Sequence, residues 1–443
     1  MSVSISTSRS LSTRRVSWAW LLAGATCVLF GVMAMEFNFA LRADSANWWA
    51  QLQASVTGET YSLGPASAHA MYPTYRESLT AMSSHTALGG AALTLAVLQF
   101  IPALRRRYRL AHRLAGGLVM LGVGASMVGA LSYLARTPLA DIYASPGFGL
   151  ALWALALACL AYLSLAVLAL RRRDYRSHMG FMALMMGTLL TAPVLRIEWA
   201  LFGITGAYDM DEVNQGVVAS LAVLCNLIMA LWMHHVGAGD LPARRRASVP
   251  TAPLLKFFGY GASAVIVHEG LLAPHGIDLI AAWRAAGESL PAVAAVWALP
   301  AAWLAATAPR EIARVVAGHT PSRLSHTLLI VTGLTALLIA VLHTETAVDS
   351  VGLRFYWAAY GLVTLALLLA ARFSTRADEP WTLLVLFLTL APVLWPALWL
   401  VAGLCAQSFT VAMWFAATVA LAAMSANGFI TAFGVRLPIG KAA

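Results

Sequence analysis

The sequence predicts an all-α, polytopic membrane helix bundle with about twelve transmembrane helices and both termini in the cytoplasm. Three observations lead to this prediction. Of the 443 residues, 60% are hydrophobic and 11% are charged, whereas soluble domains contain roughly 25% charged residues. The mean hydropathy is +0.75, and the apolar residues form runs of about 20, the length that a helix needs to cross a bilayer. The arginines lie mainly in alternate loops between these runs.

This composition excludes several classes of protein. High hydropathy excludes a cytosolic globule and a disordered chain. With four cysteines in 443 residues, a disulfide scaffold is excluded as well. All four cysteines fall in apolar runs, where a thiol packs as a small hydrophobic side chain.

Each predicted span is an apolar run bounded by charged or turn residues. The first run follows Arg14 and Arg15, as a signal peptide would, but it is longer than a signal core of about 7 to 15 residues and no Ala-x-Ala site follows it. The last two runs are divided where Gly, Cys, Gln and Ser can turn the chain. The twelve runs are Val16 to Met35, Ala81 to Leu104, Leu114 to Ala135, Gly147 to Leu170, Met179 to Trp199, Val213 to Met233, Leu254 to Leu272, Leu290 to Pro309, His326 to His343, Phe355 to Ala371, Trp381 to Ala402 and Thr410 to Phe433.

Basic residues determine the predicted orientation, because Lys and Arg in short loops stay cytoplasmic. One set of alternate loops carries most of them, with clusters at 105–113, 171–176, 244–246 and 310–323. The opposite loops hold mainly Arg42, Arg76, Arg136 and Arg284. The net charge of +10 therefore follows from topology and does not indicate a nucleic-acid partner. We expect a multi-pass protein of the cell inner membrane whose partner is the lipid bilayer.

The chain is predicted to consist of two halves. Residues 1–236 form a six-span half, residues 237–253 a polar, Pro-containing cytoplasmic linker, and residues 254–443 a second six-span half. The one long outer segment, Glu36 to Thr80, contains Trp and Tyr residues that favour the membrane interface.

Eleven histidines are the main candidates for chemistry, because ionisable groups in or near spans are costly and tend to be functional. His112 and His178 are predicted at the cytoplasmic ends of their spans, and His85 near an outer end. His234 and His235 are interpreted as helix caps. The pair His268-Glu269 could serve a transport path, although an interfacial helix end explains it better.

The region around these histidines resembles the DUF2306 family of predicted bacterial membrane proteins. The resemblance extends over about residues 85–199. It depends on a His that opens a span, Gln-Phe near the end of that span, a basic turn with His-Arg-x-x-Gly, and a later His with an Arg about five turns on. In this sequence the matching positions are His85, Gln99-Phe100, His112-Arg113 with Gly116, His178 with Met182, and Arg196. Phe181 replaces the Trp of the family pattern.

These residues suggest a cofactor site. Two membrane histidines on different helices can supply both axial ligands of a haem iron, and arginines can pair with propionates or anionic lipid. We therefore assign His112 and His178 as candidate ligands of haem b, and His85, Arg113 and Arg196 as further cofactor-binding candidates. Arg196 is expected to lie near His85 and to pair with a carboxylate or a bound anion, because an unpaired guanidinium is costly in a membrane.

The predicted function is haem- or quinone-linked redox chemistry, and whether the chain is an enzyme stays open. The alternatives are a secondary transporter, favoured by six plus six spans, a non-catalytic membrane scaffold, and histidines that merely cap helices.

Small residues at Gly122, Ser126 and Ala130 predict close helix packing. Met179, Met182 and Met186 share a helical face that suits copper(I), although ordinary methionine packing explains it better. The substrate and the oligomeric state are not predicted.

Overall fold

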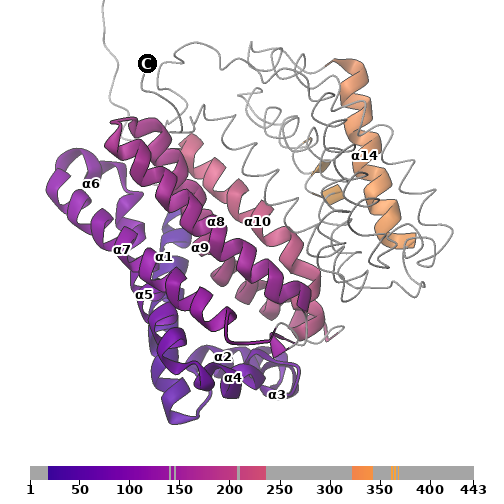
Figure 1. The fold of residues 1–443 in the computed structure, drawn as a ribbon. Helices are drawn as coiled ribbons and strands as arrows, with labels where there is room; N and C mark the ends of the chain where they lie inside the picture. The colour runs from indigo at the N-terminus through magenta and orange to yellow at the C-terminus, as the bar shows by residue number, and fades with distance from the viewer. Residues whose placement is uncertain are drawn as a thin grey trace, which may run out of the picture.

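The computed structural model of the chain describes residues 18–138, 141–143, 146–206, 210–235 and 322–342, and a few positions between 361 and 368. Every regular element within these residues is a helix (Figure 1). The helices are α1 (Trp18–Ala43), α2 (Trp48–Thr57), α3 (Glu59–Leu63), η1 (Ala68–Met71), α4 (Tyr72–Glu77), α5 (Leu79–Gln99), α6 (Pro102–Arg107), α7 (Arg109–Leu134), α8 (Pro146–Arg171), α9 (Tyr175–Thr205), α10 (Met210–His235) and α14 (Arg323–Leu342).

Five helices in the described residues, α1, α5, α7, α8 and α9, contain stretches long and apolar enough to cross a membrane. They coincide with the first five predicted spans, which confirms a multi-pass, all-helical membrane protein. Helix α10 occupies the place of the sixth predicted span, and α14 that of the ninth. The other predicted spans, the linker 237–253, and His268 and His343 lie outside the described residues.

Several helix boundaries differ from those predicted, and two of them change the organisation of the chain. Helix α1 continues to Ala43, beyond the predicted end at Met35. The second predicted span, expected to reach Leu104, ends at Gln99, and α6 begins at Pro102. Proline explains this second break, because its ring disfavours helical geometry at the preceding residue. Ile101 accordingly adopts an extended conformation.

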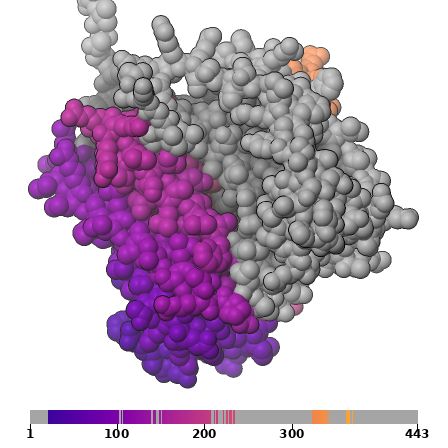
Figure 2. All heavy atoms as spheres, in the orientation of Figure 1, coloured from indigo at the N-terminus to yellow at the C-terminus, as the bar shows by residue number. Residues whose placement is uncertain are grey.

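The six long N-terminal helices form two groups of three. In one group, α5 packs between α1 and α7, and in the other, α9 packs between α8 and α10. The groups meet mainly where α7 packs on α8. Buried side chains from both groups join in one hydrophobic core, which includes Phe30, Val123, Phe181 and Met233. In the space-filling view the N-terminal part of the chain, coloured indigo to magenta, forms one continuous surface (Figure 2).

Small residues allow α5 to approach both of its neighbours closely. A Cβ placed on Gly31 of α1 would lie 2.6 Å from the carbonyl oxygen of Gly90 on α5. On α7, a Cβ on Gly129 would lie 2.7 Å from the carbonyl oxygen of Ala81, and one on Gly122 would lie 3.2 Å from the Cβ of Ala92. The predicted close packing through the small residues of this span is therefore confirmed at Gly122.

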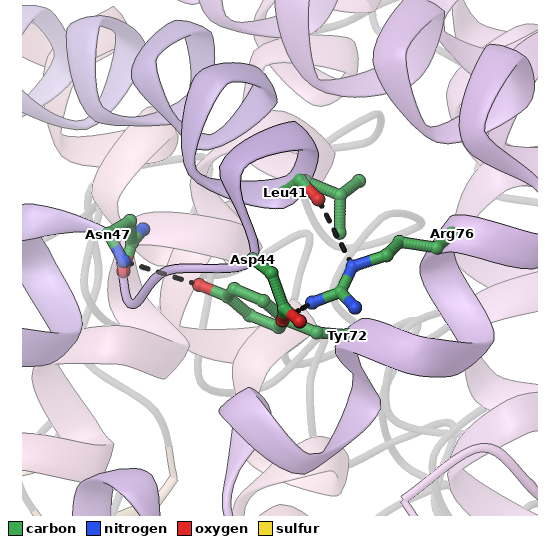
Figure 3. Close-up of polar contacts among 5 residues, drawn as sticks. All are labelled: Leu41, Asp44, Asn47, Tyr72 and Arg76. Atoms are coloured by element: carbon green, nitrogen blue, oxygen red, sulfur yellow. Dashed lines mark hydrogen bonds and ion pairs between the residues drawn. The ribbon is translucent and has the colours of Figure 1, made fainter.

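The short helices α2, α3 and α4 gather at one end of the bundle, and α6 lies at the other (Figure 1). We call these the α2–α4 end and the α6 end. By the arginine distribution, the α2–α4 end is the predicted outer end. Arg76 of α4 fastens this end to α1, because its Nε donates to the carbonyl of Leu41 at 3.1 Å and its guanidinium pairs with Asp44 (Figure 3).

Candidate functional sites at the two ends of the bundle

The structure divides the sequence-predicted site residues between the two ends. His112 and His178 come together at the α6 end, within electrostatic range of each other. Arg113 interacts electrostatically with His112 and is exposed. His85 and Arg196 come together at the α2–α4 end, also within electrostatic range. No arrangement joins all five residues in one site.

His112, in the first turn of α7, is held by Gln99 at the end of α5. With its amide oriented to satisfy its neighbours, Gln99 donates from its nitrogen to Nδ1 of His112 at 2.9 Å and to the His112 carbonyl at 3.2 Å. Its amide oxygen accepts the N–H of Gly116 at 3.0 Å. Because Nδ1 of His112 accepts a hydrogen bond, the proton of the neutral imidazole is on Nε2.

His178 has the opposite proton arrangement. It lies in the first turn of α9, which begins after Asp174, whose carboxylate accepts the backbone N–H of Ser177 at 3.1 Å as a helix cap. Nδ1 of His178 lies 3.0 Å from the carbonyl oxygen of Ala166 on α8. A carbonyl only accepts hydrogen bonds, so Nδ1 carries the proton and Nε2 of the neutral ring has a free lone pair.

Arg105 of α6 contacts the start of α9 and lies within electrostatic range of His112. Its Nη1 donates to the sulfur of Met179 at 3.1 Å, and its charge acts on His112. Nearby, the rings of Phe100 and Trp232 pack edge to face, with centroids 4.5 Å apart. The α6 end thus combines two imidazoles, an arginine and an aromatic pair.

At the α2–α4 end, His85 is bound to α7. Its Nδ1 donates to the carbonyl of Ser126 at 3.1 Å, and the Ser126 hydroxyl donates to the His85 carbonyl at 2.7 Å. These reciprocal bonds fix the ring and leave Nε2 of His85 as a lone-pair nitrogen.

Arg196 of α9 has no carboxylate partner among the described residues. Its guanidinium lies 5.4 Å from the centroid of the Trp199 ring, as a cation–π contact, and Nη1 donates to the carbonyl of Ala192 at 3.0 Å. The Trp199 indole nitrogen donates to Oδ1 of Asn214 at 2.7 Å. Arg196 and Asn214 therefore contact the same indole, one over its face and one at its edge.

Three buried tyrosines lie within the electrostatic range of Arg196, namely Tyr72, Tyr75 and Tyr143. The hydroxyls of Tyr75 and Tyr143 are 3.0 Å apart, and the Tyr143 ring is 6.2 Å from that of Trp199. Burial raises the pKa of Tyr72 to about 12 and raises the pKa values of Tyr75 and Tyr143 above their usual range. All three phenols therefore keep their protons at physiological pH, and their hydroxyl groups can donate hydrogen bonds.

The sequence did not indicate several of these residues as site residues. In the sequence, Gln99 stands out only as part of a family pattern, and Arg105 only as part of a basic loop. The tyrosines were expected at a membrane interface, yet Tyr72 and Tyr75 are buried. A sequence signal did exist, because Tyr72, Tyr75 and Arg76 lie close together in the long outer segment, but their partners Asn47, Tyr143 and Leu41 are far away in the chain.

The fold and these polar clusters define a polytopic α-helical membrane protein. A family model of DUF2306, described as a predicted membrane protein, matches residues 82–237, which confirms the resemblance over this part of the chain. The match extends from α5 through α10, beyond the expected end near residue 199. No curated protein and no solved structure matches the chain.

Proposed function

We propose that the α6 end binds the headgroup of a membrane quinone, which makes the chain a quinone-linked redox protein. The observation that carries this proposal is the pair of opposite tautomers. His112 presents an N–H at Nε2, whereas His178 presents a lone pair at Nε2. A quinone carbonyl accepts a hydrogen bond and a hydroquinone hydroxyl donates one, so the two imidazoles match both states of one headgroup.

The surroundings of the two histidines support the same ligand class. The charge of Arg105 favours a headgroup that has accepted electrons and not yet the protons that neutralise them. The N-terminal turns of α7 expose Leu110 and Leu114, by 70% and 62%, so a lipid-soluble ligand can approach from the bilayer. The protein residues supply proton positions, and a separate redox partner supplies or removes the electrons.

Binding can be measured by tryptophan quenching with a short-chain ubiquinone on the purified full chain in nanodiscs. Trp232 lies at the α6 end, so we expect saturable quenching. Loss of one hydrogen bond to the ligand weakens binding by about tenfold, so His112→Ala and His178→Ala should each lose at least this much. His112→Gln keeps an N–H donor and should bind with intermediate affinity.

His326→Ala is the matched control, because this histidine also lies in the first turn of a long helix, α14. Its affinity for the quinone should equal that of the unsubstituted chain. An unsubstituted chain that does not bind, or a His112→Ala variant that binds unchanged, would overturn the proposal.

Haem b is the second candidate, and one observation favours it. The bond from Nδ1 of His178 to the Ala166 carbonyl is the kind of contact that orients an imidazole for ligation through Nε2. His112 would have to give up its bond from Gln99 to become the second ligand. An absorption spectrum distinguishes the candidates, because His112→Gln and His112→Ala should both abolish a low-spin haem band, whereas quinone binding survives in part in His112→Gln.

A further inference from the structure

The α2–α4 end holds several buried hydrogen-bond donors that have no acceptor among the described residues. The Tyr72 hydroxyl, on a side chain that is 3% exposed, accepts the N–H of Asn47 at 3.5 Å (Figure 3). Its own O–H hydrogen has no acceptor among the described residues. The Tyr75 and Tyr143 hydroxyls share one hydrogen bond, so one of their two hydrogens also has none.

Two nitrogen groups near these tyrosines, the amide of Asn214 and the guanidinium of Arg196, are further donors. Asn214 is fully buried, its Oδ1 accepts from Trp199, and its amide nitrogen has no partner among the described residues. A guanidinium has five N–H donors. Arg196 is partly exposed, and among the described residues it donates one of them to the carbonyl of Ala192. These unmatched donors come from α4, α9, α10 and the turn at 141–143.

Backbone geometry contributes to this arrangement. Tyr143 has a φ of 51°, a left-handed conformation that is rare for a bulky side chain and that costs free energy. In this conformation its hydroxyl reaches Tyr75 and its ring lies beside both Phe148 and Trp199.

We infer that Arg196, the tyrosine hydroxyls and the amide of Asn214 form a site for an oxyanion, a phosphate or carboxylate group. An oxyanion offers several lone pairs and a negative charge, which are what the unmatched donors and the guanidinium lack. This site is separate from the proposed quinone site at the α6 end. Three acidic groups lie near these donors. Glu36 acts on Tyr72 and Asp211 acts on Tyr143, and Glu198 lies two residues after Arg196 on α9.

The oxyanion can belong to a soluble molecule or to a lipid headgroup, and thermal unfolding of the purified full chain distinguishes these sources. A ligand that binds only the folded state raises the melting temperature. One arm adds inorganic phosphate, with chloride at equal ionic strength as the reference. The other arm compares nanodiscs of phosphatidylcholine with nanodiscs that also contain phosphatidylglycerol.

We expect stabilisation in at least one arm and its loss in Arg196→Gln. Arg136→Gln is the control, because Arg136 is an exposed arginine near the same end of the bundle, and it should respond as the unsubstituted chain does. Tyr143→Phe, which removes one donor, should weaken binding by about tenfold. Glu36→Gln should strengthen it, since a negative charge is removed.

Stabilisation by phosphate identifies a soluble ligand, and stabilisation by phosphatidylglycerol alone identifies a lipid. No response in either arm would overturn the inference, and so would an equal response in Arg196→Gln. Should Arg196→Gln fail to fold, an unchanged response in Tyr143→Phe would overturn it equally well.

Discussion

The two ends of the bundle differ in how their polar groups are matched. At the α6 end, Gln99 and the Ala166 carbonyl fix the protons of two imidazoles. At the α2–α4 end, several buried donors near Arg196 have no acceptor among the described residues. The first arrangement suits a ligand that gives and takes protons, and the second suits a ligand that brings negative charge. Helix α9 contributes a residue to each end, His178 to one and Arg196 to the other. The kind of ligand that each end suits therefore depends on the local partners of these side chains more than on their helix.

The largest expected effect concerns two glycines of α7, one toward each end, that differ in what lies beside them. A Cβ on Gly129 would meet the backbone of Ala81, whereas a Cβ on Gly117, nearer the α6 end, would meet nothing within 4 Å. Because backbone cannot move aside cheaply, Gly129→Leu should destabilise the fold by about 3 kcal/mol or more. Gly117→Leu should leave the melting temperature almost unchanged, and equal losses in the two variants would show that the contact of Gly129 with α5 does not determine the cost.

Alkaline pH should weaken the α2–α4 end selectively. The pKa of Tyr72 is about 12 in the folded chain, against about 10 in an unfolded one. The unfolded state therefore releases its proton first, and stability that is complete below pH 10 falls as the pH rises toward 12, by about 2 kcal/mol for this residue. Melting curves across this range should show the fall, and Tyr72→Phe should reduce its slope. An unchanged slope would contradict the assigned burial.

The smallest expected effects concern the fastening of α4 to α1. Arg76→Ala removes a hydrogen bond to the Leu41 carbonyl and an ion pair to Asp44, and should cost about 1 kcal/mol. Asp44 is 73% exposed, and exposed ion pairs contribute little. Asp44→Asn should therefore cost less than Arg76→Ala in thermal unfolding. The reverse order would mean that the ion pair, and not the bond to the backbone, holds this end.

The sequence predicted the class and the first five spans because hydrophobic run length is a local property. It also predicted that His112 and His178 share one end, since both begin spans that enter from the same side. It did not predict the tautomers, because Nδ1 of His178 meets a carbonyl on another helix. The sequence also did not predict the unmatched donors near Arg196, because Tyr72, Tyr143 and Asn214 come together only through packing.

The family match divides the candidate sites as well. Residues 82–237 include the whole α6-end pair and Gln99. Tyr72 and Tyr75 lie outside the match, on the short helices that precede α5. The α2–α4 end thus combines residues that the family model matches with residues that it does not cover.

Helix α9 has 31 residues, which corresponds to a length of about 46 Å. The hydrocarbon core of a bilayer is about 30 Å thick, so α9 must tilt or extend into the headgroup regions on both sides. His178 and Arg196 are separated by about 27 Å along its axis, close to that thickness. Hydrophobic mismatch should consequently change the depth of both candidate sites at once, and lipids of different acyl-chain length would tune the hydration of the imidazole pair and of the guanidinium together.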